Sequence, residues 1–519
     1  MGNGMEIFDM NCMLGPTRTN REPCFRTPEA LLTEMDRLGI SEALVYASHA
    51  AMGHPADANA FAVEATRSHP RLHPCWAVLP PGTGELPEPD ELVEQMRAQG
   101  VRAARIFPGV HGFPLLERIL RPLLRALAEA GIPLIVDDGR TGWSQLTDWR
   151  GVFEIAEAHP ALPIVLIRAG GTTARALYGV WDAFPNIYIE ASYIQESRIV
   201  EEITGRFGHR RLLFGTGMPA WDPGGPMGLL AGARISQQER ADIAGNSLRR
   251  LLGIPEPEPG LEPDWPSGAD GFRVFDVHGH LGRFHSKYHR DWSAEQMVSR
   301  MDEVGVERFA VSHFLAIGAD YREGNTRIGA GVAAFPDRLV GYVVYNPNYE
   351  SEMPREMTRG FDELGCRGIK IHCNLHDTST EDPRYRLAFQ TAHERNRPML
   401  CHVHRGPSPA FLMDTLAAFP NAKFIYAHIG GGSREGLAPF LDVAHARPNL
   451  FFDLGYSKMA RGTLAWLVQH APPAQILYGS DHPVNGFPYQ LGRVLYADIP
   501  DALKRMILWD NAARIFGVQ

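Results

Sequence analysis

Two histidines separated by one residue, His278 and His280, stand at the end of a short apolar run that we expect to form a β-strand. Because alternate residues of a strand point to the same side, both imidazoles can face one point. Neutral imidazole is a common metal ligand, so this spacing suggests a metal site. Two unrelated surface histidines would give the same pattern, and the pair alone does not decide between these interpretations.

Other side chains that can bind a metal or a substrate stand at the ends of later apolar runs in the same half of the chain. In a parallel α/β barrel all strands end at one rim, where the active site is built. Residues that span much of this half would therefore meet at one point. They are His278, His280, Lys370, His372, His402, His404, Arg405, His428 and Asp481.

The elements that must position these residues occur twice. Asp9 and Asp276 open two similar stretches, each followed by a helical pattern, a glycine and a second apolar run, and Asn59 and Asn325 recur at matching places. So many ordered matches indicate a tandem duplication. Alternating prolines between the copies favour an extended spacer. We expect a first domain at 5–254, a linker at 255–271 and a second domain at 272–519.

Each copy alternates apolar, strand-like runs with helical patterns eight times. Their continuous Val, Ile, Leu and Phe content is typical of parallel strands buried on both faces. Eight such units in about 250 residues predict a (β/α)8 barrel, so the fold class is α/β with two tandem TIM-like barrels. In the second copy the strands are expected near 274–278, 309–314, 339–346, 368–372, 398–404, 423–429, 450–456 and 476–481.

The composition of the chain limits the classes of molecule that it is expected to bind. The 519 residues carry a formal charge of -9 and no Lys/Arg-rich run, which argues against binding a phosphate backbone. No apolar run approaches the roughly 20 residues that cross a bilayer. The six cysteines show no C-x-x-C spacing. We therefore expect a cytoplasmic protein with reduced thiols that binds a small molecule, not nucleic acid or membrane.

The second copy resembles the amidohydrolase superfamily. The motifs that carry the resemblance are Asp-x-His-x-His-x-Gly from Asp276, Gly-Ile-Lys-Ile-His from Gly368, His-x-Gly-Gly from His428 and Gly-Ser-Asp-x-Pro from Gly479. The amidohydrolase-related branch, which includes aminocarboxymuconate semialdehyde decarboxylase and gamma-resorcylate decarboxylase, is the most similar. The resemblance covers the second copy from end to end, whereas the first copy shares only the pattern of strands and helices and not the ligand residues.

This resemblance implies one divalent metal ion, zinc or alternatively manganese, held by His278, His280, His402 and Asp481. His404 competes with His402 for its role, and the offset from the preceding proline favours His402. Three imidazoles and a carboxylate with one open position are the ligands with which zinc activates water. Asp481 is then expected to act as general base and proton shuttle, and His428 to act beside the metal.

Four further residues are expected to contact the substrate: Lys370, His372, His404 and Arg405. In binuclear relatives a strand-four lysine is carboxylated and bridges two metals, so that role for Lys370 stays open. Arg405 and the glycines at 430–432 are also suited to a substrate carboxylate, because guanidinium and bare backbone N–H groups bind oxyanions.

The first copy has lost these ligands. Asn11, Met13, Asp137, Arg168 and Gly217 stand where the second copy has the proposed metal-site residues, and Arg105 replaces Lys370. We expect no catalytic metal there. The copy is interpreted as an intramolecular pseudo-dimer partner, which leaves homo-oligomerisation open. The alternative is a site for an anionic effector around Arg105, Arg140 and Arg168.

The function expected from these observations is metal-dependent hydrolysis of a C–N or C–O bond in a small cyclic or carboxylated substrate, through a metal-activated water. Metal-dependent, non-oxidative decarboxylation of a small carboxylic acid uses the same residues and is the first alternative. A non-catalytic binding protein is the second.

Overall fold

The computed structural model describes residues 6–18, 23–137, 147–169, 173–258, 269, 271–402, 404, 406–431 and 433–518. The chain divides into two compact units, and each is described by itself. Unit 1 comprises residues 1–194 and 198–265, and unit 2 comprises residues 195–197 and 266–519. Most of the expected linker at 255–271 lies outside the described residues. No helix in the described parts is long and apolar enough to span a bilayer.

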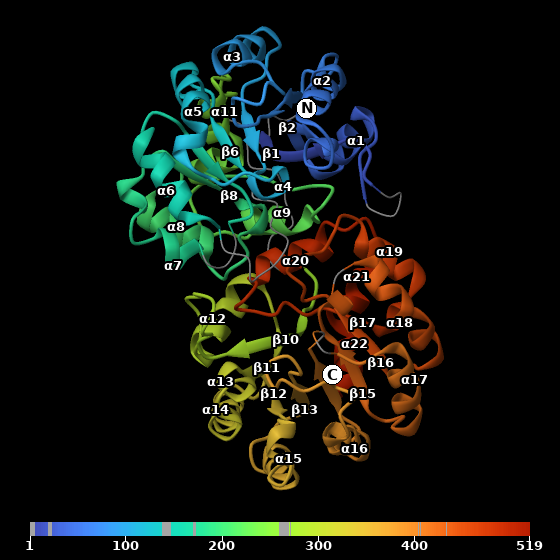
Figure 1. Cartoon of the computed structure of the whole chain (residues 1–519). Coiled ribbons are helices and arrows are strands. Elements are labelled where there is room, and N and C mark those ends of the chain that lie inside the picture. The colour runs from blue at the N-terminus through green and yellow to red at the C-terminus, as the bar shows by residue number, and fades with distance from the viewer. Residues whose placement is uncertain are drawn as a thin grey trace. The chain divides into compact units, whose positions relative to one another are not determined.

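Unit 2 is an eight-stranded parallel barrel. Its strands pair in sequence order, and helices surround them (Figure 1). The ring closes where the Val277 N–H donates to the Tyr478 carbonyl at 3.0 Å and Gly279 forms a parallel bridge with His482. The strands are β10 (Phe275–Leu281), β11 (Arg308–His313), β12 (Leu339–Val344), β13 (Gly368–Ile371), β14 (Pro398–Cys401), β15 (Lys423–Tyr426), β16 (Leu450–Asp453) and β17 (Ile476–Leu477).

The helices of unit 2 follow its strands, as the alternating pattern predicts. Local signals set their ends: the Ser293 side chain caps the first helix in a capping box with Gln296, and Gly305 ends it at φ 78°. The helices are α12 (Ala294–Val304), α13 (Phe314–Ile317), α14 (Tyr321–Ala334), α15 (Met353–Asp362), α16 (Arg386–Glu394), α17 (Pro409–Ala418), α18 (Arg434–Ala446), α19 (Thr463–His470), α20 (Phe487–Leu495), α21 (Asp501–Arg505) and α22 (Asn511–Phe516).

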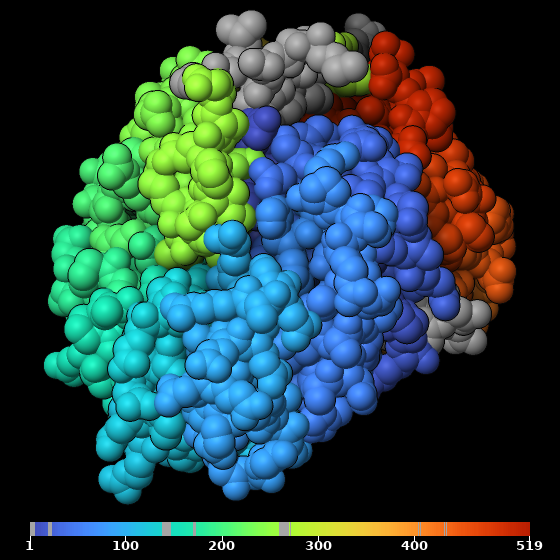
Figure 2. Space-filling model, turned by 90° about the horizontal axis from the view of Figure 1, so that it is seen from above, coloured from blue at the N-terminus to red at the C-terminus, as the bar shows by residue number. Residues whose placement is uncertain are grey.

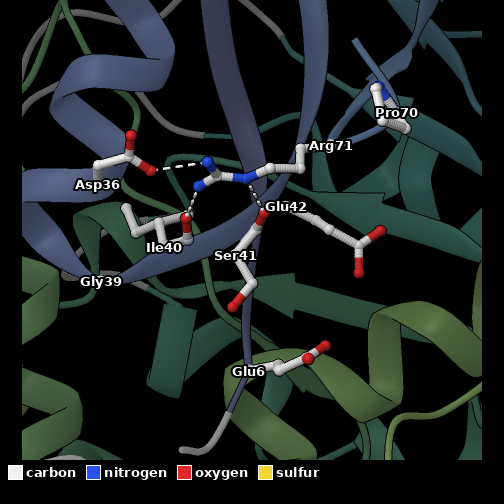
Figure 3. Close-up of a pocket in the computed structure, with 8 residues that line it drawn as sticks. All are labelled: Glu6, Asp36, Gly39, Ile40, Ser41, Glu42, Pro70 and Arg71. Atoms are coloured by element: carbon white, nitrogen blue, oxygen red, sulfur yellow. Dashed lines mark hydrogen bonds and ion pairs between the residues drawn. The ribbon is translucent and has the colours of Figure 1, made fainter. Parts of the chain in front are cut away.

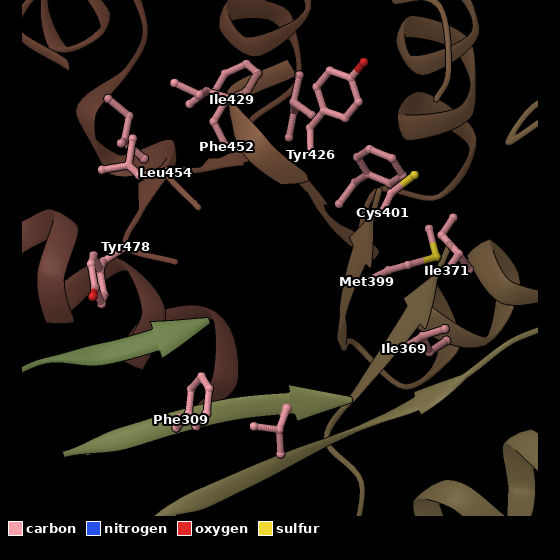
Figure 4. Close-up of a cluster of buried hydrophobic side chains, with 14 of the residues drawn as sticks. Phe309, Ile369, Ile371, Met399, Cys401, Tyr426, Ile429, Phe452, Leu454 and Tyr478 are labelled. Carbon is pink, nitrogen blue, oxygen red and sulfur yellow. The ribbon is translucent and has the colours of Figure 1, made fainter. Parts of the chain in front are cut away.

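Period-two alternation divides the strand residues of unit 2 between two apolar clusters. One set packs outward against the helices and includes Phe309, Ile369 and Met399 (Figure 4). The other set packs with Trp509 and with Phe516 of the last helix. Because both faces of every strand are buried, the strands read as continuous apolar runs in the sequence.

Unit 1 repeats the same strand order in two sheets, β1-β2-β3 and β4 through β9. The break falls at Cys75, whose N–H still donates to the Val45 carbonyl at 2.8 Å, so the ladder continues across it. The Met10 N–H closes the ring on the Phe214 carbonyl at 3.1 Å. The strands are β1 (Ile7–Leu14), β2 (Ile40–Ala47), β3 (Leu72–Pro74), β4 (Trp76–Ala77), β5 (Ala104–Ile106), β6 (Leu134–Val136), β7 (Ile164–Leu166), β8 (Ile187–Glu190) and β9 (Leu212–Leu213).

The last helix of unit 1 returns to the start of the chain. Figure 2 shows its lime-green residues beside the dark blue N-terminal segment, and Arg249 pairs there with Glu6 at 3.3 Å. The helices are α1 (Pro28–Leu38), α2 (Pro55–Thr66), α3 (Pro89–Ala98), α4 (Pro108–His111), α5 (Glu117–Ala130), α6 (Trp149–Ala158), α7 (Thr173–Leu177), α8 (Ile199–Phe207), α9 (Gly224–Ala231), α10 (Gln237–Ala241) and α11 (Ser247–Leu252).

The duplication extends to individual hydrogen bonds. The Asn59 side chain exchanges two hydrogen bonds with the backbone of Ala77, and Asn325 does the same with Val344. Asp9 accepts from the N–H groups of Asn11 and Thr216, as Asp276 accepts from those of His278 and Ser480. These matches and the strand order confirm the predicted fold of two tandem barrels.

Candidate functional site

The strand-one histidines face one carboxylate. His278 and His280 are buried on β10, and their Nε2 atoms lie 3.6 Å and 3.1 Å from Oδ1 of Asp481. The ligand atoms of these three residues all lie within 4.8 Å of one another. The sequence predicted that both rings face one point, and the structure places them so.

The other ring nitrogen of each histidine has a hydrogen-bond partner. Nδ1 of His278 lies 3.1 Å from Oδ2 of Asp453, and Nδ1 of His280 lies 3.0 Å from the Ser312 hydroxyl. A carboxylate can only accept, so the His278 proton belongs on Nδ1 and its Nε2 lone pair faces Asp481. The Ser312 hydroxyl can donate or accept, and when His280 donates to it from Nδ1, both Nε2 atoms can bind a cation.

Sequence reasoning did not single out Asp453 or Ser312. Asp453 is the last residue of β16, and Ser312 is the next-to-last residue of β11. Both are fully buried. The sequence feature that could have identified both residues is a polar side chain at the carboxyl end of a predicted barrel strand.

Asp481 is held by the backbone around it. It lies beyond β17, which ends earlier than the sequence pattern indicated, and adopts φ 63°. Its N–H donates to the His278 carbonyl at 2.8 Å. Asp276 accepts from the N–H groups of His278 and Ser480, which ties the two segments together. Burial raises the pKa of Asp481 to about 6.

His428 lies beside this cluster. It follows β15 in a 3-10 turn, Ala427–Gly431, with φ 57°, and its ring centroid lies 4.8 Å from that of His278. Its Nδ1 contacts the Gly455 carbonyl, and its Nε2 lies 3.1 Å from Nδ1 of His402. His278, His428 and Asp453 form a second group whose ligand atoms lie within 4.8 Å.

His402 approaches the cluster through His428 and belongs to neither of the two groups. Its ring stacks on His372, with the centroids 4.0 Å apart. His404 is exposed, and Arg405 lies outside the described residues. The structure thus gathers three of the four predicted metal ligands around one point and places the fourth next to His428.

Lys370 points into the barrel and is fully buried, with its Nζ 3.0 Å from Nε2 of His278. Burial lowers its pKa to about 8. Burial, reinforced by the nearby ammonium, also lowers the pKa of His278 and His280 well below the ordinary value. These imidazoles are therefore neutral near pH 7, which is the state that binds a metal.

An aromatic wall adjoins the histidines. The Phe314 ring stacks on His280 at 4.5 Å between centroids, and Phe284 stacks on Phe314 at 4.7 Å. Val344 and Val484 pack in the same apolar cluster. One side of the site is thus flat and apolar, a surface that suits a planar ring.

The residues fit a divalent metal ion on the evidence of their hydrogen bonds. Each of the two neutral imidazoles is held by a hydrogen bond at Nδ1, and the Asp481 carboxylate faces both of their Nε2 atoms. Two nitrogens and an oxygen are the donor atoms that zinc and manganese accept.

The corresponding end of unit 1 is built differently. Arg105 is buried, donates to Oδ2 of Asp137 at 2.6 Å and contacts Oδ1 of Asn11 with both terminal nitrogens at 3.1 Å. Arg168 lies 3.6 Å from the other Asp137 oxygen. Asn11 and Met13 replace the strand-one histidines, so the ligand set found in unit 2 is not present among these residues.

A cavity of about 620 Å³ opens at the opposite, N-terminal end of the unit 1 strands (Figure 3). Arg71 crosses it and is bound by Asp36 at 2.6 Å and by the carbonyls of Ser41 and Ile40. Barrels of this kind carry their chemistry at the other end, and Arg71 is already satisfied by the protein. This cavity is not the candidate site.

Comparison with protein families matches the amidohydrolase family twice, over residues 13–254 and 275–518. The chain belongs to the amidohydrolase family. Both halves of this amidohydrolase are family members, although within the described residues the histidine and aspartate cluster occurs only in the second. No curated protein matches the chain in sequence.

Several solved structures resemble half of this amidohydrolase. The 5-carboxyvanillate decarboxylase of Sphingomonas paucimobilis is 18% identical, covers 48% of this chain and 100% of its own, and gives a TM-score of 0.37. The 5-carboxyvanillate decarboxylase of Novosphingobium aromaticivorans in complex with manganese is 14% identical, covers 48% of this chain and 98% of its own, and gives a TM-score of 0.40. A 2,6-dihydroxybenzoate decarboxylase is 15% identical, covers 48% of this chain and 98% of its own, and gives a TM-score of 0.37. Likeness at this level says nothing about the substrate of this chain.

Proposed function

We propose that unit 2 is a metal-dependent enzyme for small carboxylated substrates and that His278, His280 and Asp481 hold a single divalent ion. One observation carries the proposal: Oδ1 of Asp481 lies within 3.6 Å of Nε2 in both histidines. The opposite nitrogens contact Asp453 and Ser312. Nε2 of His278 also lies 3.0 Å from the Lys370 ammonium, so a cation bound there would take the place of that contact.

His402 remains the proposed fourth ligand. Its support is its place next to His428, whose ring packs against His278. The ion, when bound, would polarise a substrate carboxylate or activate a water molecule. Zinc and manganese both suit two imidazoles with carboxylate oxygen, and the donor set does not choose between them.

The protein's own groups supply binding and proton transfer. Asp481 and His428 border the cluster and are the groups proposed to pass a proton to or from the reacting atom. Lys370 places an ammonium group 3.0 Å from His278, where it can attract a substrate carboxylate. Phe314 and Phe284 offer the flat apolar wall for a ring.

Non-oxidative decarboxylation is the reaction we propose to test first. An ammonium group beside an aromatic wall suits a planar ring that bears a carboxylate. In this reaction the C–C bond to the carboxylate breaks, carbon dioxide leaves, and one proton replaces it on the ring carbon. Hydrolysis remains the second candidate, because Asp481 can equally accept a proton from water.

Isotopic labelling separates the two reactions. The metal-loaded full chain is incubated with a panel of hydroxylated and carboxylated benzoates and lactones in deuterated, oxygen-18 water. A decarboxylase gives carbon dioxide and a product deuterated at the vacated carbon. A hydrolase gives a product with oxygen-18 and no carbon dioxide.

The Asp481→Asn variant is the control for either outcome, because it removes the carboxylate at the centre of the cluster. Turnover equal to that of the native chain would overturn the proposed site. Tight metal binding with no turnover across the panel would favour a non-catalytic binding protein.

A further inference from the structure

A connected group of polar side chains fills the carboxyl end of the unit 1 barrel. Asn11 contacts Arg105, which pairs with Asp137, and Asp137 also pairs with Arg168. The Arg168 guanidinium lies 5.9 Å from the centroid of the Trp221 ring. We call these five residues the unit 1 cluster. They lie at the barrel end where proteins of this fold bind their ligands.

The unit 1 cluster has more hydrogen-bond donors than acceptors. Four buried nitrogens, namely Asn11 Nδ2, Arg105 Nε, Arg168 Nε and Trp221 Nε1, have no acceptor in the parts of the chain that the structure describes. Asn11 and Arg105 are each only 1% exposed. Buried N–H groups without an acceptor are rare in folded proteins because their desolvation is not compensated, so four in one cluster are exceptional.

The acceptors of the unit 1 cluster are already engaged. Oδ1 of Asn11 is bound by both terminal nitrogens of Arg105. The two oxygens of Asp137 are bound by Arg105 and Arg168 respectively. These oxygens thus face terminal guanidinium nitrogens, and none of them accepts from the four nitrogens named above.

The cluster also carries a surplus of positive charge. Among the residues that the structure describes, two guanidinium groups face one carboxylate, that of Asp137. Glu190 is a nearby buried acid, and burial raises its pKa to about 7, so it offsets the surplus only in part near neutrality. An excess of N–H donors together with an excess of positive charge favours a negatively charged ligand that has several oxygen acceptors.

We propose that unit 1 binds a small oxyanion at this cluster, in the place where unit 2 holds its metal-site residues. Arg105 occupies the position of Lys370, and Arg168 that of His428. The chemistry fits the carboxylate of a small organic acid and equally inorganic phosphate. Arg140, which the sequence suggested as a third cation, lies outside the described residues.

The test is calorimetric titration of the metal-free full chain with benzoate and, separately, with inorganic phosphate. One saturable binding event that persists in a His280→Ala chain is expected, since that substitution alters only the other unit. Saturation by benzoate alone identifies an organic acid, and saturation by phosphate alone identifies the inorganic ion.

Arg168→Gln is the diagnostic substitution, and Arg206→Gln is its matched control. Both arginines belong to unit 1 and lie near aromatic rings, but Arg206 is far more exposed and pairs with Glu202. Both substitutions change the net charge equally. Arg168→Gln is expected to weaken binding about tenfold or more, whereas Arg206→Gln leaves it unchanged.

Trp221→Phe provides a second readout if Arg168→Gln fails to fold. Binding should change the tryptophan fluorescence of the native chain, and this change should be reduced in Trp221→Phe, which keeps the ring packing but lacks the N–H donor. No saturable binding of either anion, or equal weakening by both arginine substitutions, would overturn the proposal.

Discussion

At the residue scale, the proposed metal centre depends on which nitrogen of each imidazole carries the proton. Asp453 accepts from the Gly455 N–H at 2.7 Å through Oδ1 and from His278 Nδ1 at 3.1 Å through Oδ2. This arrangement fixes the His278 ring and leaves its Nε2 lone pair toward Asp481. Asp453 is thus a positioning residue, because it acts on the proposed metal through His278.

The isosteric substitution Asp453→Asn tests this role. The new oxygen can keep the bond from Gly455, so the new NH2 group faces His278 Nδ1 and must donate to it. The ring proton then moves to Nε2, which blocks the proposed metal contact. We expect the affinity for zinc to fall about 10- to 100-fold with little change in the melting temperature.

Competition with a chromophoric chelator measures that affinity. Asp442→Asn, which removes an exposed carboxylate from α18 of the same unit, is the control and should bind zinc like the native chain. Nitrogen-15 correlation spectra of histidine-labelled metal-free protein would show the tautomer directly. Unchanged zinc affinity in Asp453→Asn would remove the positioning role.

At the element scale, each barrel uses a buried asparagine to join a helix to the next strand. Asn325 on α14 bonds to both backbone groups of Val344 and to Glu356, and Asn59 on α2 bonds to both backbone groups of Ala77. Truncation leaves buried backbone groups without partners, and each lost partner costs about 1–3 kcal/mol.

We therefore expect Asn325→Ala to lower the unfolding free energy of unit 2 by about 2–4 kcal/mol, and Asn59→Ala to do the same for unit 1. Urea unfolding measured by hydrogen exchange of peptides from each unit would assign the effect. If either substitution destabilised both units equally, the barrels would not unfold independently.

Strand β8 of unit 1 ends in a buried acid that makes stability depend on pH. Burial raises the pKa of Glu190 to about 7, although its oxygens accept from the Ser192 N–H at 2.7 Å and the Ser192 hydroxyl at 2.8 Å. The folded state therefore holds this proton to a higher pH than the unfolded state does. Stability is greatest below the unfolded pKa and is lost as pH rises toward the folded pKa.

The expected loss from Glu190 is up to about 1.4 kcal/mol per pH unit between the unfolded pKa and about 7. Glu190→Gln keeps the shape without the titration, so its unit 1 should lose less stability than the native unit over this range. Calorimetry from pH 5 to pH 8 would compare the two. Parallel pH profiles for the native and Glu190→Gln chains would contradict the assignment.

At the scale of the whole molecule, the two units have the same fold but differ in the cation at the carboxyl end of the barrel. In unit 2 it is a proposed metal ion, and in unit 1 it is an arginine side chain. Unit 2 gathers neutral imidazoles and a carboxylate for a proposed metal, whereas unit 1 buries Arg105 against Asp137. A metal ion stabilises only the folded state that binds it. A guanidinium group is part of the chain and cannot be removed by a chelator.

Chelation should therefore act on one unit. A ligand at a thousand times its Kd contributes about 4 kcal/mol, so removal of the ion should lower the melting temperature of unit 2 and leave unit 1 unchanged. Calorimetry with and without chelator measures this, and Asn59→Ala identifies the unit 1 transition. A shift of that transition would show that unit 1 also holds a metal.

Local patterns in the sequence were enough to predict the duplication, the eight-strand pattern of each copy and that His278 and His280 face one point. Strand alternation puts His278 and His280 on one side, and a barrel brings all strand ends to one rim. The positive-φ glycines Gly39 and Gly305 could likewise be predicted from the sequence, because they end the first helix of each copy. These features depend on residues that are neighbours in the chain.

Only the tertiary structure decided the partners of those residues. Asp453 stands 175 positions from His278, and Arg105 stands 94 positions from Asn11, so no local pattern links either pair. The contact between His402 and His428 and the surplus of donors in the unit 1 cluster likewise follow only from the tertiary structure. Periodicity fixes which side of a strand a residue faces, whereas a hydrogen bond also requires the register and tilt of strands on the far side of the barrel.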